Sequence, residues 1–521
     1  MSDTHSHFEP HRRLIPASDG GEQYGVAMVG GYQLIASAIH EAREDAKRDG
    51  LNFVAVHCGD SFQGSVYFQR YRGIANALAL NAMNLDIMAV GNHEFDLGPE
   101  PFAAFCDKAD FPVISSNLVM DESACPSLRY QEKSGRLITS ASVLPVMIKT
   151  MLDGTAVGFL GLTLESLPNL ADTGPGLWLH APVEFACHVV KHLRRQGLKH
   201  IIVLSHLGYE QDVRLAESVD GISAILGGHT HDLQGQQDSL NLGKRGVCGE
   251  RISGAPIFHC GENAQHLGLY DLILDGEGTV LEIEGETIVP IDKASVTPEA
   301  ESLLRVRSDI VLTVPDPTIY HSMFQHHPLT QQKYSQPLVV GKALEHVRVP
   351  TEKVSSDLAP MVAEAIFQNS EVVGLQPDLA LLNAGVIRTG IQAGRYDDLV
   401  SLFHQVIPFD LDLIVLHVSA STLHQVIQRA SKEAQNPEKN GRFPYLHSPK
   451  CRYPHIQSNK IYRIVTTRYV ADGKDGYLEF KSCKRECQPL QLKLRDACEL
   501  YFEKYFRETV QQEAVRSVSG I

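Results

Sequence analysis

The first half of the chain alternates short apolar runs with segments of helical periodicity. Each of five apolar runs delivers an Asp, Asn or His at or just past its end, and the runs lie at 52–58, 86–90, 111–117, 200–205 and 222–226. Apolar residues three and four positions apart predict helices at 32–49 and 73–83. Alternating strands and helices indicate an α/β fold. In such folds ligands bind at the carboxyl ends of the strands, where these polar residues lie.

A β-rich stretch follows and predicts a change of architecture. Apolar runs at 268–274 and 280–289 flank Asp275-Gly276-Glu277-Gly278, which predicts a hairpin. We expect this hairpin to belong to a second sheet that closes a β-sandwich over the first. Residues 297–312, which begin Thr297-Pro298-Glu299, predict a helix. Residues 313–336 are rich in Pro, His and Gln and predict a linker.

The rest of the chain predicts a second α/β domain. Helices are predicted at 357–368 and 421–433, strands at 377–382, 413–418 and 462–467, and a polar, Pro-rich loop at 434–459. The predicted boundaries are therefore 1–292 for the first domain, 293–336 for a linker helix and linker, and 337–521 for the second domain.

Composition and charge narrow the class of protein. A chain of 521 residues is long enough for two domains, and 43% hydrophobic with 21% charged residues describes an ordinary globular protein. The formal net charge of −15 argues against nucleic-acid binding, which requires a basic face. An anionic substrate would need local positive charge from metal ions or a few arginines. No apolar run is long enough to predict a transmembrane helix. The polar start, Met1-Ser2-Asp3-Thr4-His5, predicts no signal peptide, so we expect a cytoplasmic protein.

Seven polar residues, at the N-terminus and at four of these strand ends, have the chemistry of metal ligands: Asp3, His5, Asp60, Asn92, His206, His229 and His231. Two carboxylates, four imidazoles and one amide oxygen suit two divalent ions. Asp60 is the natural bridge between two ions, and such a pair generates a bridging hydroxide and clamps a phosphoryl group. One buried histidine or one capping asparagine would have a structural explanation. Five polar strand ends together favour the metal site.

The segment Gly91-Asn92-His93-Glu94-Phe95-Asp96 adds a second kind of chemistry. His93 is not required as a ligand, so its imidazole can protonate a leaving oxygen or stabilise the transition state. Asp96 can orient that imidazole, as carboxylates orient catalytic histidines elsewhere. These residues predict a metal-assisted phosphoester hydrolase.

The sequence resembles the 5'-nucleotidase branch of the calcineurin-like metallophosphatases over nearly its whole length. The metal motifs that match, in the family's order, are Asp3-x-His5, Gly59-Asp60, the 91–96 segment, His206-x-Gly208 and Gly228-His229-Thr230-His231. In the second half, the 383–388 and 472–477 segments resemble the family's Asn-x-Gly-x-x-Arg and Gly-Gly-Asp-Gly-Phe/Tyr loops.

The resemblance implies a four-layer αββα metallophosphatase domain, a linker helix and a smaller α/β substrate-recognition domain. It implies two divalent metal ions, such as zinc, manganese or cobalt. One would be held by Asp3, His5, Asp60 and His231, and the other by Asp60, Asn92, His206 and His229. It also implies catalysis by a His93–Asp96 dyad. The substrate would be a small nucleotide or phosphate ester, bound by Asn383, Arg388, Tyr469 and Asp475.

The sequence departs from the family pattern at four places. The chain begins two residues before Asp3, where the family has an apolar strand, so either a start lies upstream or Asp3 and His5 lie on a frayed end. The family's second base-stacking aromatic aligns with Leu413, which predicts weaker binding of the base. Lys474 replaces a glycine. Arg348-x3-Glu352 is one residue longer than the family spacing, which favours Arg388 as the anion contact.

The resemblance implies hydrolysis of nucleoside 5'-monophosphates as the leading function. Other enzymatic interpretations remain open: a 2',3'-cyclic nucleotide phosphodiesterase, a nucleotide-sugar hydrolase or a hydrolase of another small phosphate ester. A non-catalytic binding protein with an impaired metal site is a further alternative. The presence of both His93 and Asp96 speaks against it, because a binding protein has no use for this pair.

Overall fold

The computed structural model describes residues 1–16, 24–235, 246–324, 338–340, 342–345, 356–372, 376–392, 394–396, 399–409, 411–433, 446–449, 456–486 and 493–519. The chain divides into two compact units. The first comprises Met1–Gln63 and Tyr67–Leu329, and the second comprises Gly64–Val66 and Thr330–Ile521. Residues 293–324, predicted as part of the linker, fall in the first unit.

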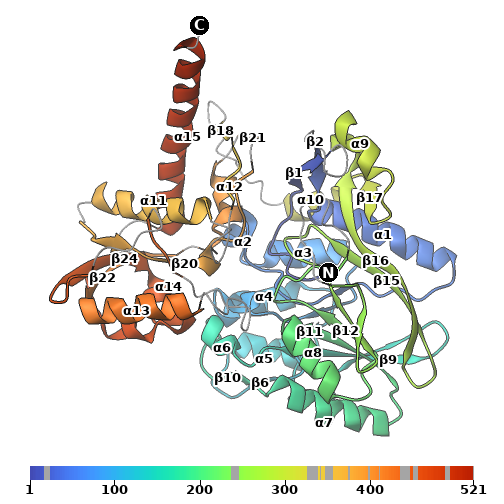
Figure 1. Cartoon of the computed structure of the whole chain (residues 1–521). Helices are drawn as coiled ribbons and strands as arrows, with labels where there is room; N and C mark the ends of the chain where they lie inside the picture. Colours follow the sequence, from blue (N-terminus) through green and yellow to red (C-terminus); the bar gives the residue numbers. More distant parts are fainter. Residues whose placement is uncertain are drawn as a thin grey trace. The chain divides into compact units, whose positions relative to one another are not determined.

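Two sheets of parallel strands form the centre of the first unit (Figure 1). The first sheet has the order β3 (Val56–His57), β4 (Ile87–Ala89), β5 (Val113–Ile114) and β7 (Leu137–Ile138). The second has the order β13 (Glu250–Ile252), β14 (Ala255–His259), β12 (Ala224–Gly227), β11 (His200–His206), β9 (Ala156–Thr163) and β8 (Met147–Thr150). Its four central strands are parallel, and β13 and β8 are antiparallel edges.

The two sheets pack face to face and carry helices on their outer sides. Ile87 and Ile114 of the first sheet share a buried cluster with Phe159 and Leu204 of the second. Helices α7 (Pro182–Arg195) and α8 (Tyr209–Ser218) cover the other face of the second sheet. Helix α5 (Pro126–Lys133) packs on β7 and on α4 (Pro99–Lys108), which in turn contacts α3 (Ile74–Ala82). The predicted αββα order is confirmed.

Local sequence explains why these helices form where they do. Helix α7 begins with Pro182 at its first turn, where a missing N–H costs nothing. It buries Ala186, Val190 and Leu193, which are four and three residues apart and therefore share one face. The remaining helices before residue 325 are α1 (Tyr32–Arg48), α2 (Val66–Tyr71), α6 (Leu167–Leu170), α9 (Pro298–Leu304) and α10 (Pro317–Phe324).

The hairpin at 268–289 forms as predicted, but its predicted place in the sandwich was wrong. Strands β15 (Leu267–Leu274) and β16 (Val280–Asp292) belong to a separate sheet with β1 (His11–Pro16), β2 (Tyr24–Val29) and β17 (Ile310–Thr313). The parallel strands β9, β11, β12 and β14 already supply the second layer of the sandwich. The helix predicted over 297–312 was also too long, because α9 ends at Leu304 and 310–313 pairs with β16 as a strand. A two-stranded ribbon of β6 (Leu118–Met120) and β10 (Leu177–Leu179) completes the unit.

The second unit is built on a four-stranded sheet with the order β19 (Leu379–Ala380), β24 (Ile461–Thr467), β22 (Leu413–Ser419) and β25 (Lys484–Arg485). One face packs on α11 (Leu358–Val372), α12 (Leu399–Val406) and α15 (Leu494–Ser519). The other face packs on α13 (Ala420–Glu433) and α14 (Arg468–Ala471). Two short ribbons join β18 (Leu338–Val340) to β21 (Gly394–Tyr396) and β20 (Leu382–Asn383) to β23 (Leu446–His447).

Two predicted irregular segments fall partly outside the described residues. Of the predicted 313–336 linker, 325–336 lies outside the described ranges, and α10 occupies part of the remainder. Of the predicted 434–459 loop, only 446–449 and 456–459 are described. No helix in the described part of the chain is both long and apolar enough to cross a membrane.

Candidate metal centre and substrate-binding residues

The N-terminal segment is built into the first unit, so the frayed end considered from the sequence was wrong. The backbone N–H of Asp3 donates to the Gly59 carbonyl at 2.9 Å, and that of His5 donates to the Asp60 carbonyl at 3.1 Å. Cys58, at the end of β3, donates in turn to the carbonyl of Met1 at 2.9 Å. The Asp3 side chain is completely buried and His5 is 6% exposed. Both residues are therefore held against the loop that carries Asp60.

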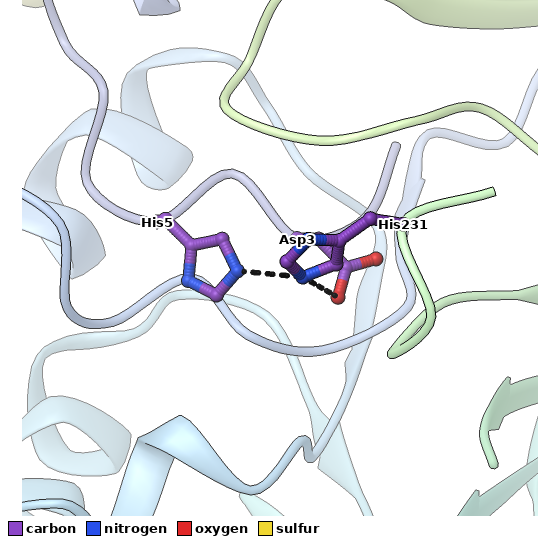
Figure 2. A group of neighbouring side chains, drawn as sticks. All are labelled: Asp3, His5 and His231. Atoms are coloured by element: carbon purple, nitrogen blue, oxygen red, sulfur yellow. Dashed lines mark hydrogen bonds and ion pairs between the residues drawn. The ribbon is translucent and has the colours of Figure 1, made fainter. Parts of the chain in front are cut away.

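Six of the seven predicted metal ligands lie in overlapping groups whose ligand atoms are within 4.8 Å of one another. The groups are Asp3–His5–His231, His5–Asp60–His93 and Asp60–His206–His229. Figure 2 shows the first of them: the His231 ring lies between the His5 ring and the Asp3 carboxylate. His231 Nε2 is 3.1 Å from His5 Nε2 and 3.6 Å from Asp3 Oδ1. His5 and Asp60 each belong to two groups and link the set.

Asp60 lies at the centre of this cluster. One carboxylate oxygen, Oδ2, is 3.0 Å from His206 Nε2 and 4.0 Å from His93 Nε2. The other, Oδ1, accepts from the backbone N–H of His93 at 2.8 Å. Burial acts to raise the pKa of Asp60, but the imidazoles of His206 and His93 outweigh it and hold the pKa well below its ordinary value. Burial likewise acts to lower the pKa of His206, and Asp60 outweighs it and raises the pKa to about 10.

Three imidazoles of the cluster share one orientation. Nδ1 of His5 donates to the Phe62 carbonyl at 3.2 Å, and Nδ1 of His206 donates to the Cys58 carbonyl at 2.8 Å. Nδ1 of His231 contacts a carboxylate oxygen of Glu262. A carbonyl or carboxylate oxygen only accepts, so Nδ1 carries a hydrogen in each ring and Nε2 is the nitrogen that faces the cluster, where it can bind a metal ion once it has no proton. Histidine ligands of metals have this arrangement.

The residues present fit divalent metal ions. With Nδ1 protonated, the facing Nε2 atoms of His5 and His231 are two lone pairs 3.1 Å apart beside the Asp3 carboxylate. A cation between such donors replaces their repulsion by attraction. The seventh predicted ligand, Asn92, is 7% exposed, and its buried Oδ1 has no hydrogen-bond partner among the described residues. An unpaired buried carbonyl is costly unless an ion or water satisfies it.

The loops that carry these ligands have a backbone that few side chains adopt. Among the predicted ligands, Asp3, His5, Asp60, His229 and His231 all have positive φ angles, between 47° and 80°. Such angles are uncommon outside glycine and concentrate at functional sites. Close approach adds a second constraint, because a Cβ on Gly91 would lie 2.2 Å from Asp60 Oδ1. Only glycine fits at that position.

The predicted His93–Asp96 pair is present. His93 Nδ1 is 2.7 Å from Asp96 Oδ2, which also accepts from Gln63 Nε2 at 2.8 Å. Because Asp96 holds Nδ1, the Nε2 atom of His93 faces Asp60. This is the position required of a group that exchanges a proton with a substrate bound at the cluster.

The second unit brings three of the predicted substrate-binding residues together. Asn383 Nδ2 donates to Asp475 Oδ2 at 3.0 Å, and the Tyr469 hydroxyl donates to Asp475 Oδ1 at 3.0 Å. Asn383 Oδ1 is buried and has no hydrogen-bond partner among the described residues. The fourth, Arg388, instead places its guanidinium 5.0 Å from the centre of the Phe409 ring.

The position that aligns with the family's second base-stacking aromatic is occupied by a core residue. Leu413 is completely buried in β22 and packs in the core of the second unit, so its side chain has no access to a ligand. Phe409 is the nearby aromatic that sequence reasoning passed over, and the dipeptide Pro408-Phe409 was the signal. Lys474 lies in the 3₁₀ turn before Asp475, and Arg348 lies outside the described residues.

Three further residues of the first unit were missed from the sequence. Glu94 accepts from the backbone N–H groups of Asp60, Ser61, Phe62 and Gly91. Gln63 supports Asp96, and Glu262 contacts His231. The sequence offered a clue to the role of Glu94, because a charged residue inside an otherwise buried motif requires hydrogen-bond or ion-pair partners. It offered none for Gln63, and Glu262 follows strand β14, whose carboxyl end reaches the same edge of the sheet.

Comparison with known proteins adds independent evidence on the family and the fold. Residues 1–233 match the family model described as calcineurin-like phosphoesterase. A probable 5'-nucleotidase of Treponema pallidum is 26% identical, over 92% of this chain and 86% of that protein. An NAD 5'-nucleotidase of Haemophilus influenzae is 25% identical, over 92% and 85%. The crystal structure of a 5'-nucleotidase precursor from Thermus thermophilus has the same fold, with a TM-score of 0.78, 24% identity and coverage of 97% and 96%.

Proposed function

We propose that this chain, a phosphoric ester hydrolase whose first domain belongs to the calcineurin-like phosphoesterase family, releases phosphate from nucleoside 5'-monophosphates. The observation that carries the proposal is the convergence of six carboxylate and imidazole ligands beside the His93–Asp96 pair. The nucleotide preference is supported by relatives named 5'-nucleotidases that match nearly the whole chain.

Two divalent ions are proposed for the cluster, of zinc, manganese or cobalt. Asp3, His5, Asp60 and His231 would hold one ion, and Asp60, Asn92, His206 and His229 would hold the other. When bound, such ions lower the pKa of a water molecule and neutralise charge on a phosphoryl group. Asp60 is suited to serve both positions because its carboxylate lies in two of the three ligand groups.

His93 is proposed as the group that protonates the leaving oxygen. Asp96 holds its Nδ1 and stabilises the imidazolium, so the Nε2 atom donates the proton. Gln63 donates to the same oxygen of Asp96 and fixes the carboxylate in place. A positioned acid of this kind contributes about 10²–10⁴-fold to a rate.

The second unit is proposed to bind the nucleoside. Asn383 and Asp475 offer hydrogen-bonding groups in one cluster, with the Tyr469 ring beside them. Arg388 supplies a guanidinium, which suits an anion or a sugar hydroxyl. Phe409 adds a second aromatic ring for stacking, the role that the family's aromatic has at the position aligned with Leu413.

Phosphate release from AMP tests this function. Protein stripped with a chelator is assayed with and without added Mn²⁺, Co²⁺ or Zn²⁺, and glucose phosphate, bis(p-nitrophenyl) phosphate and NAD are run in parallel. NAD is included because one relative is named for it. We expect metal-dependent activity that favours AMP and falls by about 10²–10⁴-fold in His93→Ala. His188→Ala, on the exposed side of α7, is the matched control.

Two outcomes would contradict parts of the proposal. Equal activity on AMP and on the simple esters would remove nucleoside recognition and leave the hydrolytic site in place. Loss of bound metal in His93→Ala would show that His93 is a ligand rather than the proton donor. Metal content of each variant is therefore measured beside its activity.

A further inference from the structure

The loop after β14 reaches the proposed metal cluster at two points. Glu262 places a carboxylate oxygen on Nδ1 of His231. The next residue, Asn263, donates its backbone N–H to the carbonyl of Asp3 at 2.8 Å. His231 and Asp3 both belong to the first ligand group. One short loop thus braces two members of the same group.

His231 is supported differently from His5 and His206, the two other proposed ligands whose Nδ1 partners the structure gives. His5 and His206 donate their Nδ1–H to the neutral backbone carbonyls of Phe62 and Cys58. Nδ1 of His231 instead lies against a carboxylate oxygen of Glu262, and a carboxylate is a stronger acceptor than a carbonyl and makes the opposite ring nitrogen a stronger electron donor. That opposite nitrogen, Nε2, faces His5 and Asp3.

We propose that Glu262 is a positioning residue that fixes the tautomer and orientation of His231 and thereby strengthens one of the two proposed metal positions. The proposal rests on the proposed function, since it requires metal ions at the cluster. It goes further in giving the position served by Asp3, His5 and His231 a specific supporting residue. The position served by Asp3, His5 and His231 has a carboxylate behind one of its imidazoles. At the other position, the support resolved for His206 is a carbonyl.

Glu262 is suited to mutation because its side chain is 26% exposed. Replacement by Gln keeps the size and one acceptor oxygen but removes the charge. Replacement by Ala removes the acceptor altogether. Glu250, on β13 of the same sheet, contacts the Tyr209 hydroxyl rather than an imidazole and provides the control.

Titration of the metal-free protein with Co²⁺, followed by calorimetry and by visible absorption, tests the inference. The wild type is expected to bind two equivalents. In Glu262→Ala we expect one equivalent to bind about 10–100-fold more weakly and the other to be unchanged, the usual effect of losing such a partner. In Glu262→Gln, the affinity for the weakened equivalent is expected to lie between the affinities of the wild type and of Glu262→Ala. Glu250→Ala is expected to match the wild type. Thermal unfolding of the metal-free variants is expected to be unchanged.

Activity provides an independent measurement on the same variants. The metal concentration needed for half-maximal AMP hydrolysis should rise in Glu262→Ala, while kcat at saturating metal stays near that of the wild type. Equal weakening of both equivalents, or no weakening, would overturn the role of Glu262 and leave the proposed function intact. A wild type that binds no Co²⁺, Mn²⁺ or Zn²⁺ would overturn both.

Discussion

Glu94 connects two loops of the proposed metal cluster, the loop at Asp60 and the loop at Gly91, through hydrogen bonds to both. Oε2 accepts from the backbone N–H groups of Asp60 and Gly91 at 2.9 and 2.8 Å. Oε1 accepts from the N–H groups of Ser61 and Phe62 at 2.7 and 3.2 Å and from the Ser61 hydroxyl at 3.1 Å. Burial, followed by the charge of Asp60, raises the pKa of Glu94, and these five donors compensate the carboxylate for lost water. The backbone of Asp60 is therefore set by a residue that is no ligand itself.

Replacing Glu94 by Gln should loosen both loops. The new amide group would face the N–H groups of Asp60 and Gly91, so two buried donors would lose their acceptor. Each unsatisfied donor costs about 1–3 kcal/mol. We expect a lower free energy of unfolding and weaker binding of both metal equivalents, in contrast to Glu262→Ala. Denaturant unfolding and Co²⁺ titration measure the two effects, with the exposed Glu100→Gln on α4 as the control. Unchanged metal binding in Glu94→Gln would show that the loop holds its shape without this carboxylate.

His266 makes the stability of the first unit depend on pH. It is 5% exposed, and neither ring nitrogen has a hydrogen-bond partner among the described residues. Burial, with the nearby Arg13 charge, lowers the pKa of His266 to about 3. In the unfolded chain its pKa returns to about 6.5. Between these two pKa values His266 is protonated in the unfolded state but not in the folded state. The free energy of unfolding therefore falls as the pH drops from about 6.5 toward 3.

His266→Leu should remove this contribution. Between pH 7.5 and 5.5 the wild type is expected to lose about 1.4 kcal/mol more than the variant. The single tryptophan, Trp178, lies in β10, so its fluorescence follows denaturation of the first unit. Chelator in every sample removes metal linkage, and the exposed His188→Leu provides the control. Parallel pH dependences in wild type and His266→Leu would show that this ring titrates normally in the fold.

At the scale of single residues, the sequence identified the residues that gather at the cluster better than the residues that support them. Asp60, Asn92 and His206 stood out because a polar residue directly after an apolar strand lies at a known edge of the sheet. Supports such as Glu262 and Gln63 are defined by contacts across loops, which no periodicity reveals. The left-handed backbone at Asp3 and His231 was equally invisible, because histidine and aspartate also occur in ordinary conformations.

The sequence placed most helices and strands correctly along the chain. It did not always predict their length or, for strands, the strand with which they pair. The run at 52–58 yields only Val56–His57 as paired strand, because the register with β4 begins at Val56. Helices α1 and α13 agree with their predictions within one residue, since each has one continuous apolar face. The hairpin β15–β16 was assigned to the wrong sheet because pairing between sheets depends on contacts far apart in sequence. Strand β17 was predicted as helix for the same reason, as its partner β16 lies about 20 residues earlier.

The turn that carries Asp475 is the element on which nucleoside recognition should depend. Asp475 has a φ of 53° and joins Asn383, at the end of β20, to Tyr469 in α14. Asp475→Ala removes the shared acceptor of both side chains. We expect KM for AMP to rise about tenfold, the effect of one net hydrogen bond. The rate of bis(p-nitrophenyl) phosphate hydrolysis is expected to stay constant.

A neighbouring aspartate distinguishes recognition from folding of this turn. Asp472 pairs with Arg485 on the surface and contacts neither Asn383 nor Tyr469 in the hydrogen bonds resolved. Asp472→Ala should therefore leave KM for AMP unchanged. A fall in activity on both substrates in Asp475→Ala would assign the residue to the fold of the second unit instead.

At the scale of the whole molecule, the proposed chemistry and the proposed recognition belong to different units. All seven proposed metal ligands, with His93 and Asp96, lie in the first unit, and Asn383, Arg388, Tyr469 and Asp475 lie in the second. The sequence predicted this division because metal motifs end at His231 and the matching loops resume at Asn383. Under the proposed function, substitutions in the second unit can change the affinity for the nucleoside without altering the hydrolytic groups.

Metal binding should change the stability of the first unit but not that of the second. An ion that binds only the folded first unit stabilises it by about 2.7 kcal/mol at a free concentration 100 times its Kd. We expect added Mn²⁺ or Co²⁺ to raise the denaturation midpoint reported by Trp178, and a chelator to reverse the change. Hydrogen exchange of β22 and α13 in the second unit should be unaffected, while β11 and β12, next to His206 and His229, should become more protected. Equal gains in both units would mean that they unfold as one cooperative body. No gain at β11 and β12 would contradict the assignment of His206 and His229 as ligands.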